Sequence, residues 1–305
     1  MMLLRRIAYL LIAASIGVAI PFWLTPWWAL IGLFGGLLYL LSLDPTLVQD
    51  RRKRFGSILL WATLHIIVGV TDQRLQVFVA FPLLSLQLIY WLMTRFSSVE
   101  EVWTNSSRRV TTGLMMLAGV GMMMLDQLPF LAYLIAACIL ITAAHIYHAF
   151  AHQNGSRTLA AHWVALTLLQ WIGVYLGSAM LPLLNISPTA WLFDTPPVEA
   201  GYFAVLAVLF GMGNQITADM RGENRRITGL SAYWLVTFGS IMLEMLQSCV
   251  AVVRLHILGI SLVDERFMDW SWVEPFTRLG MFWVLAVLLG WIIYLVQFII
   301  RRPKF

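Results

Sequence analysis

Residues 279–300 read LGMFWVLAVLLGWIIYLVQFII, and none of these twenty-two residues is charged. A helix of that length measures about 33 Å, enough to cross the hydrocarbon core of a bilayer, which is about 30 Å thick. Similar apolar runs recur along the whole 305-residue chain. Lipid offers no hydrogen-bond partner to exposed backbone groups, so each run is expected to be helical.

The fold class predicted from these runs is all-α: a polytopic integral membrane protein with about ten transmembrane helices. Composition agrees, because 60% of residues are hydrophobic and 11% are charged, against about 25% charged in a soluble domain. We expect a single transmembrane domain over 1–305, with a weakly supported division into halves 1–125 and 126–305. The predicted spans are 7–24, 27–43, 56–71, 76–94, 110–125, 130–151, 160–183, 201–218, 230–252 and 279–300.

The arginines and lysines predict the orientation of these spans. With the N-terminus inside, sixteen of the twenty basic residues fall in inside segments, and only Arg74, Arg254, Arg266 and Arg278 fall outside. Positive residues concentrate in cytoplasmic loops. Both termini are therefore predicted to be cytoplasmic, with 184–200 and 253–278 as the longest outside loops. A bacterial inner membrane is the expected location.

The net charge of +5 does not indicate a nucleic-acid partner. The basic residues form short clusters between apolar runs instead of one extended face, which is typical of membrane topology. Membrane lipid is the expected partner, and other membrane proteins are possible ones.

Residues 144–152, AHIYHAFAH, place His145, His148 and His152 on one helical face. A short turn then leads to His162, which we expect beside His148. The cluster has three functional interpretations, namely a transition-metal site, a haem site or a proton path. The alternative, which we favour, is an ordinary set of histidines at a membrane interface. No cofactor is predicted, and binding of haem or a transition metal is the less favoured interpretation.

Glu244, in SIMLEMLQS, is the one carboxylate deep inside a predicted span, and Gln247 lies one turn further on. A charge at the centre of a membrane helix costs about 2.5–3.5 kcal/mol on insertion scales. Glu244 is therefore either a proton-coupling or substrate-binding acid, or a protonated side chain bonded to a neighbouring helix. The buried Gln170 is expected to link two helices by a hydrogen bond.

Two polar clusters at predicted span ends have competing interpretations. The inner cluster is a solvated helix end or an anionic headgroup site, and it comprises Asp219, Arg221, Arg225 and Arg226. The outer cluster is an interfacial belt or a rim that binds a sugar or lipid and could include an acid–base pair. It comprises Asp264, Glu265, Asp269, Glu274, Trp270 and Trp272. Two membrane interfaces and ten spans are the simpler explanation of the fourteen tryptophans.

Three functions follow from this pattern. The first is a transporter or flippase for a small solute or amphiphile, with Glu244 and the histidines lining its route. The second is a membrane-embedded enzyme acting on a lipid or lipid-linked substrate. The third is a non-catalytic subunit that anchors or assembles an envelope complex.

Overall fold

The computed structural model describes residues 78–79, 81–96, 105–124, 127–128, 130–151, 159–184, 186, 196–221, 230–260 and 269–300. Within these ranges the chain is helical and contains no strand. The elements are α5 (Phe81–Phe96), α6 (Asn105–Met123), α7 (Leu131–Ala151), α8 (Leu159–Met180), η4 (Leu181–Leu184), α10 (Pro196–Arg221), α11 (Leu230–Ile260), η6 (Ser271–Val273) and α12 (Glu274–Ile300). The described part is thus an all-α bundle.

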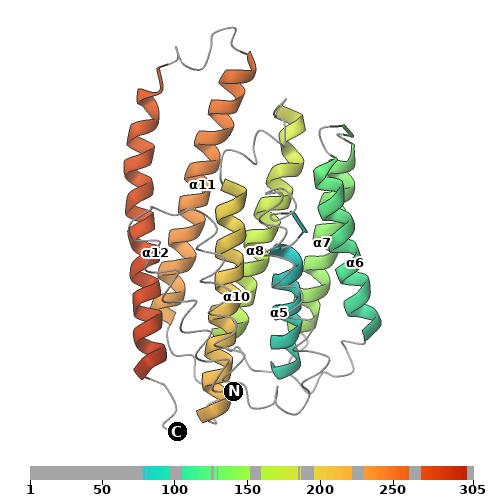
Figure 1. The fold of residues 1–305 in the computed structure, drawn as a ribbon, viewed down its shortest axis with the longest axis vertical. Helices are drawn as coiled ribbons and strands as arrows, with labels where there is room; N and C mark the ends of the chain where they lie inside the picture. Colours follow the sequence, from blue (N-terminus) through green and yellow to red (C-terminus); the bar gives the residue numbers. More distant parts are fainter. Residues whose placement is uncertain are drawn as a thin grey trace, which may run out of the picture.

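Consecutive helices from α5 to α12 run in alternating directions, roughly side by side (Figure 1). The most extensive contacts join α11 to α12 and α8 to α10. Helix α8 also contacts α7 and α11, so it lies near the centre of the described bundle. At about 1.5 Å per residue, the 31 residues of α11 extend over about 46 Å. This helix and α12 reach beyond the others at the top of Figure 1.

The described helices overlap the fourth to tenth spans predicted from the sequence. The first three predicted spans lie outside the described residues, as does most of the first half in the proposed division into halves. Two predicted loops are shorter than expected. The predicted bounds of loop 253–278 are wrong at both ends, because α11 continues to Ile260 and helical structure resumes at Ser271. The predicted end of loop 184–200 is also wrong, because α10 begins at Pro196. Proline is well tolerated in a first helical turn, where its missing N–H costs nothing.

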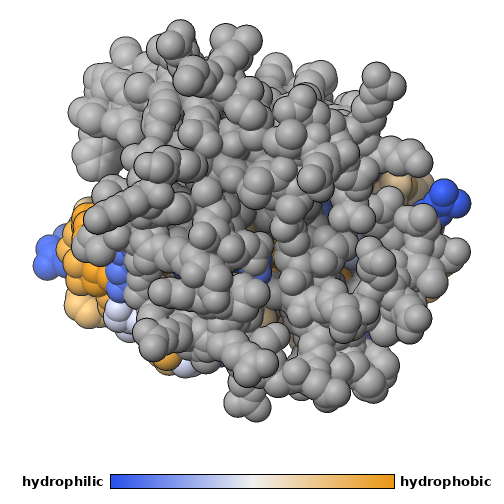
Figure 2. Space-filling view, turned by 90° about the horizontal axis from the view of Figure 1, so that it is seen from below, coloured by the Kyte–Doolittle hydropathy of each residue, from blue (hydrophilic) through white to orange (hydrophobic). Residues whose placement is uncertain are grey.

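Within the described ranges, three helical segments are long and apolar enough to cross a membrane: Leu159–Leu184, Leu230–Leu258 and Ser271–Gln297. Many of their large apolar side chains face outward; on α12 they include Leu279, Met281, Phe282, Leu285, Leu289, Ile292 and Leu295. Figure 2 shows hydrophobic surface on the flank where α12 lies in Figure 1. A helix that is apolar on every side but packed on only one requires a lipid solvent. The chain is accordingly an integral membrane protein.

Two glycines allow α11 and α12 to pack closely. A Cβ atom added at Gly239 would lie 2.7 Å from Val287 Cγ2 and 3.1 Å from the Val287 backbone nitrogen. A Cβ added at Gly290 would lie 2.8 Å from Val236 Cγ2. Small residues that let backbones approach are the usual basis of helix association in membranes, where apolar burial gives no net advantage over lipid.

The glycine contacts predict the effect of adding one methyl group. Gly239→Ala should destabilise the α11–α12 pair by about 1–3 kcal/mol, since part of the clash is with backbone that cannot rotate away. Gly280→Ala is the matched control, because its Cβ would meet Leu243 and Leu246 at an ordinary 3.6 Å. Unfolding of both variants in lipid, measured as the loss of helical signal with denaturant, tests this. Equal midpoints for the two variants would contradict the packing described here.

Candidate functional site

Helices α8 and α11 run parallel, with a constant offset of seventy residues. The ring of Trp163 lies 5.1 Å from the ring of Tyr233, measured between centroids. Gln170 bonds Ser240, which is 70 residues further along the chain. Beyond that pair, Leu181 and Ala251 share an apolar cluster. The same offset brings Glu244 level with Val174, which lies near the middle of the segment Leu159–Leu184.

Polar side chains on α11 follow one stripe along this contact. Ser240, Glu244, Gln247 and Ala251 lie three or four residues apart, so they share a helical face. Since Ser240 and Ala251 contact the α8–η4 segment, Glu244 and Gln247 between them face the interior of the bundle. The Oε1 atoms of both side chains are shielded from solvent. We call this row, together with Gln170, the polar seam.

The hydrogen bond between Gln170 and Ser240 lies at the end of the polar seam that is nearest Tyr233. Gln170 Nε2 donates to Ser240 Oγ at 3.1 Å, and Ser240 Oγ donates to the Thr237 carbonyl oxygen at 3.2 Å. Gln170 and Ser240 are both buried. One turn earlier on α8, Thr167 Oγ1 lies 3.0 Å from the carbonyl oxygens of Trp163 and Ala204. The sequence prediction that Gln170 links two helices is confirmed, with Ser240 as the partner that no sequence pattern identified.

Aromatic rings close the polar seam at the end where α11 begins. Trp163 is 0% exposed and packs edge-to-face against Phe210, Tyr233 and Tyr294. Tyr294 Oη donates to the Phe210 carbonyl oxygen at 2.8 Å. Trp163 is therefore a core residue, a role that the sequence did not reveal. Its sequence neighbours carry no signal that distinguishes a core tryptophan from a belt tryptophan, because both lie near span ends.

The predicted histidine cluster divides between two helix contacts. His145 Nδ1 lies 3.1 Å from Thr111 Oγ1 on α6. The His162 ring packs edge-to-face on Tyr233 of α11, with 5.6 Å between centroids. The side chain of His148 and the whole of His152 lie outside the described residues. Among the described residues, no group of three or more potential ligands gathers to hold a metal ion.

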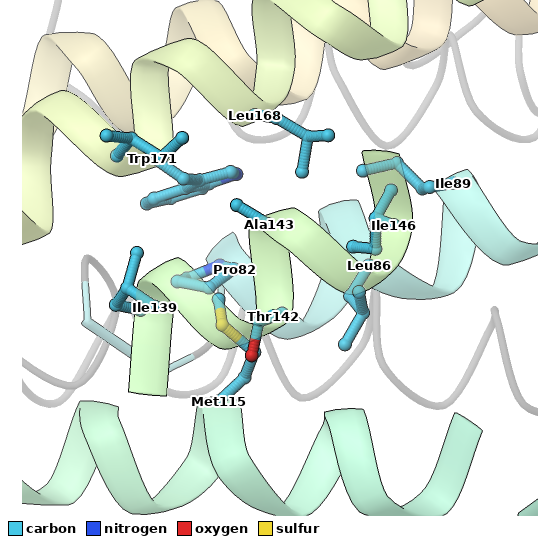
Figure 3. A pocket seen from close by; sticks show the side chains of 11 residues that line it. Pro82, Leu86, Ile89, Met115, Ile139, Thr142, Ala143, Ile146, Leu168 and Trp171 are labelled. Atoms are coloured by element: carbon cyan, nitrogen blue, oxygen red, sulfur yellow. The ribbon is translucent and has the colours of Figure 1, made fainter. Parts of the chain in front are cut away.

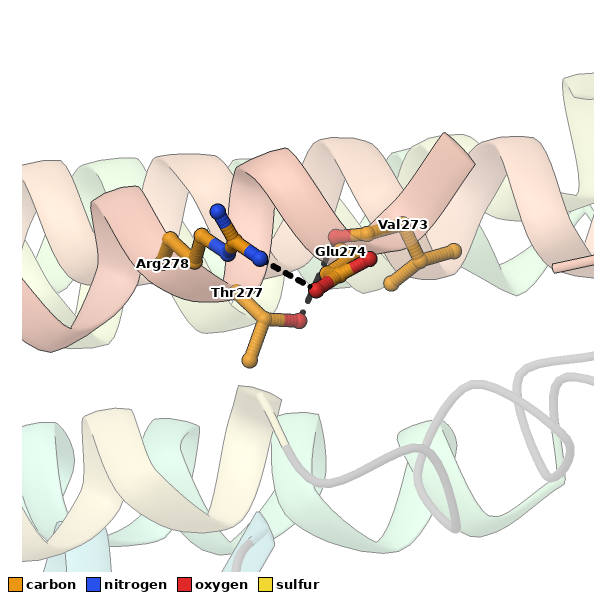
Figure 4. Close-up of polar contacts among 4 residues, drawn as sticks. All are labelled: Val273, Glu274, Thr277 and Arg278. Carbon is orange, nitrogen blue, oxygen red and sulfur yellow. Dashed lines mark hydrogen bonds and ion pairs between the residues drawn. The ribbon is translucent and has the colours of Figure 1, made fainter. Parts of the chain in front are cut away.

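At the outer rim, the described carboxylates make local contacts at the start of α12. Asp269 Oδ1 accepts the Ser271 backbone N–H at 2.9 Å, and this bond holds the pKa of the carboxyl below its ordinary value. Glu274 pairs with Arg278 at 2.6 Å, while Thr277 donates to the Val273 carbonyl oxygen (Figure 4). All of these groups are exposed. They stabilise a helix start, where negative charge is favourable.

The indole rings of the rim also connect the two long helices. The guanidinium carbon of Arg254 lies 5.7 Å from the centroid of the Trp270 ring, so the end of α11 meets the approach to α12. Trp270 in turn lies beside Trp272, at 6.2 Å between centroids. Asp264 and Glu265 lie outside the described residues.

The predicted inner headgroup cluster lies mostly outside the described residues. Asp219 and Arg221 belong to the last turn of α10, but their side chains are not described. Arg225 and Arg226 lie beyond the described part of the chain.

A small cavity lies among α5, α6, α7 and α8, lined by apolar side chains such as Met115, Ile139 and Trp171 (Figure 3). Its volume is about 20 Å³, which is room for a single water. The hydroxyl of Thr142 lines it, and this group has no hydrogen-bond partner among the described residues. The cavity is too small for a solute, so the polar seam remains the stronger candidate site.

No protein-family model, curated protein or solved structure matches the chain. The site is therefore interpreted from its own geometry.

A double-mutant cycle tests the hydrogen bond between Gln170 and Ser240 in the polar seam. Gln170→Leu, Ser240→Ala and the double variant should give a coupling energy of about 0.6–1.7 kcal/mol, the range measured for hydrogen bonds between membrane helices. The free energy of unfolding in lipid is the quantity to measure. Additive effects of the two substitutions would show that no bond couples α8 to α11 at this level.

The Asp269 contact predicts an acid-sensitive helix start. Because the pKa is lowered in the folded chain, the contribution to stability is present above the ordinary carboxyl pKa and is lost as the pH falls through the folded value. NMR titration of ¹³C-labelled aspartate should show one low midpoint that is missing in Asp269→Asn. An Asp269 midpoint at or above the ordinary value would rule out the bond to Ser271.

Proposed function

We propose that the chain is a proton-linked transporter or flippase, with Glu244 as the acid that exchanges the proton. The observation that carries this proposal is the polar seam: a carboxyl group and an amide face the bundle interior halfway along apolar helices. Ionisable residues at such positions are costly and generally serve proton or substrate routes. Substrate sites of carriers also lie near the bilayer midplane, and Glu244 is level with the middle of the Leu159–Leu184 segment.

The proposal includes a topology of ten spans with both termini cytoplasmic, in a bacterial inner membrane. The alternating directions of α5 to α12 support it (Figure 1). Helix ends that carry Arg95, Arg108 and Arg221 then share one side, which becomes the cytoplasmic side under the positive-inside rule.

The side chains along the polar seam suit the stepwise movement of a proton between the helices. Tyr233 and His162 lie at its inner end, Gln170 and Ser240 lie below the middle, and Glu244 and Gln247 follow toward the outer end. Carboxyl and imidazole groups can exchange a proton, while hydroxyl and amide groups donate and accept hydrogen bonds along the row. Transport therefore accounts for polar groups that would otherwise only weaken membrane insertion.

The enzyme alternative receives less support, because the two described rim carboxylates are engaged locally with Ser271 and Arg278. An anchoring role would account for the outward apolar side chains, but it would leave the polar seam without a function. Both alternatives predict that Glu244 is dispensable for solute movement.

Inverted membrane vesicles containing the full chain test the proposal. After a pH gradient is formed, a panel of neutral, anionic, cationic and amphiphilic solutes is added, and proton movement is followed by acridine orange fluorescence. At least one solute should discharge the gradient in the wild type. Glu244→Gln should abolish that discharge, since glutamine keeps the shape but cannot exchange a proton.

Glu274→Gln is the matched control, because this carboxylate is exposed and paired with Arg278 outside the polar seam. It should behave like the wild type. The proposal fails if no solute moves protons in the wild type, or if Glu244→Gln retains the wild-type response.

A further inference from the structure

We infer that the chain has a hinge where α5 begins, and that the hydroxyl group of Tyr175 on α8 is the latch that holds this hinge in the conformation described here. The inference goes beyond the proposed function, since it concerns a movement of α5 and requires no proton exchange at Glu244. Three observations carry it. Pro82 deprives a carbonyl group of its helical partner, a side chain of another helix bonds this carbonyl, and free space borders the proline.

The carbonyl oxygen of Phe78 lacks its regular α-helical partner. In an α-helix it would accept the N–H of the residue four positions later, which is Pro82, and proline has no N–H. The backbone at Phe78 and Val79 is π-helical, a geometry that usually forms short bulges, frequently at functional sites. Prolines and π-bulges are established causes of sharp kinks in helices. This segment is therefore a natural place for a hinge.

Tyr175 supplies the missing donor from outside the helix. Its Oη atom donates to the carbonyl oxygen of Phe78. Tyr175 is 0% exposed and Phe78 is 2% exposed, so water does not compete for this bond. The two rings also pack edge-to-face, with 6.0 Å between centroids. Neighbouring helices commonly satisfy backbone groups that proline frees in a membrane helix, and here the bond fixes the start of α5 to α8.

Helix α6 lies against the same turn at Gly119. A Cβ atom added there would collide with the Phe78 carbonyl oxygen and would lie 2.9 Å from Val79 Cγ2. A glycine allows this close approach of two backbones. Because glycine has no side chain, α6 contributes packing at this point, and Tyr175 contributes a side-chain hydrogen bond. Breaking that bond is therefore the step that would release the turn.

Free space borders the proline ring. Pro82 lines the cavity of about 20 Å³, together with side chains of α6, α7 and α8 (Figure 3). These side chains are apolar apart from Thr142 and the indole N–H of Trp171. A water molecule here would have few polar partners, whereas a buried water usually makes about three hydrogen bonds. We therefore expect a dry void, into which the proline ring can shift without displacing water.

The latch lies at the depth of the proposed proton acid. Tyr175 follows Val174, which is level with Glu244 across the contact between α8 and α11. Helix α8 therefore contacts the start of α5 and the polar seam at one level. Interrupted helices near the bilayer midplane form the substrate sites of many carriers. A role of the hinge in transport rests on the proposed function, whereas the hinge itself does not.

A single labelled peptide group tests the hinge in the full chain. The dipeptide Phe–Val occurs once in the sequence, at residues 78–79, so carbonyl-¹³C phenylalanine combined with ¹⁵N valine gives one correlated NMR signal. In lipid nanodiscs, its ¹³C shift reports the hydrogen bonding of the Phe78 carbonyl. Relaxation dispersion of the Val79 ¹⁵N nucleus reports motion in microseconds to milliseconds.

Tyr175→Phe should move the carbonyl signal to higher field, because phenylalanine cannot donate the bond. The Val79 dispersion should show a minor displaced state in the wild type. Loss of a typical hydrogen bond should raise the population of this state about fivefold in the variant.

Pro82→Ala restores an N–H that can bond the Phe78 carbonyl within the helix. In this background, Tyr175→Phe should scarcely move the carbonyl signal, and the Val79 dispersion should disappear. Tyr294→Phe is the matched control, because Tyr294 is also a buried tyrosine that donates to a backbone carbonyl, that of Phe210. It should leave the signal of residues 78–79 unchanged.

Two results would overturn the inference. Equal shifts of the carbonyl signal by Tyr175→Phe with Pro82 and with Ala at that position would show that Tyr175 does not replace the bond lost at the proline. A Val79 signal without dispersion in both the wild type and Tyr175→Phe would show that no hinge moves.

The vesicle assay distinguishes this inference from the proposed function. If the NMR results are as expected but no solute moves protons, the hinge stands and the proposed function fails. If Glu244-dependent proton movement is found while Val79 shows no dispersion, the proposed function stands and the hinge is excluded.

Discussion

The absence of water from the bilayer core is the constraint on which the rest of this structure depends. Without water, every backbone group must bond within its own helix, which fixes the all-helical fold. Apolar burial gives helices no advantage over lipid, so close packing and hydrogen bonds must hold them together. Gly239 and Gly290 allow close packing between α11 and α12. The Gln170–Ser240 bond is a hydrogen bond between α8 and α11.

The same constraint means that the polar side chains of the polar seam indicate either a structural or a functional role. A polar side chain in this environment either bonds to a neighbour or costs free energy. Gln170, Ser240 and Thr167 have their partners inside the bundle, and they need no further explanation than helix association. Glu244 and Gln247 continue the same row into a region where α8 carries glycines with open space beside them. Glu244 adds an ionisable group to this row, and for that reason we propose it as the proton-exchanging acid.

The sequence predicted the helices well, because a run of apolar residues between charged or turn residues can adopt few other structures in lipid. It also selected Glu244 and Gln170, since a polar residue in such a run is conspicuous. It did not reveal Ser240 or Trp163 as core residues, because their roles depend on which helices become neighbours. The offset of seventy between α8 and α11 is a property of packing, and no local pattern encodes it. For the same reason the sequence did not reveal the contact of His145 with Thr111 on α6 or that of His162 with Tyr233 on α11.

The parallel register of α8 and α11 is the central claim, and cysteine cross-linking in the native membrane measures it directly. With Cys138 and Cys249 replaced, the pair Val174→Cys and Glu244→Cys should be joined rapidly by a short bifunctional thiol reagent. The pair Val174→Cys and Ala251→Cys, two turns out of register, should be joined slowly or not at all. Faster linkage of the second pair would contradict the register, and Glu244 would then no longer lie between these two helices.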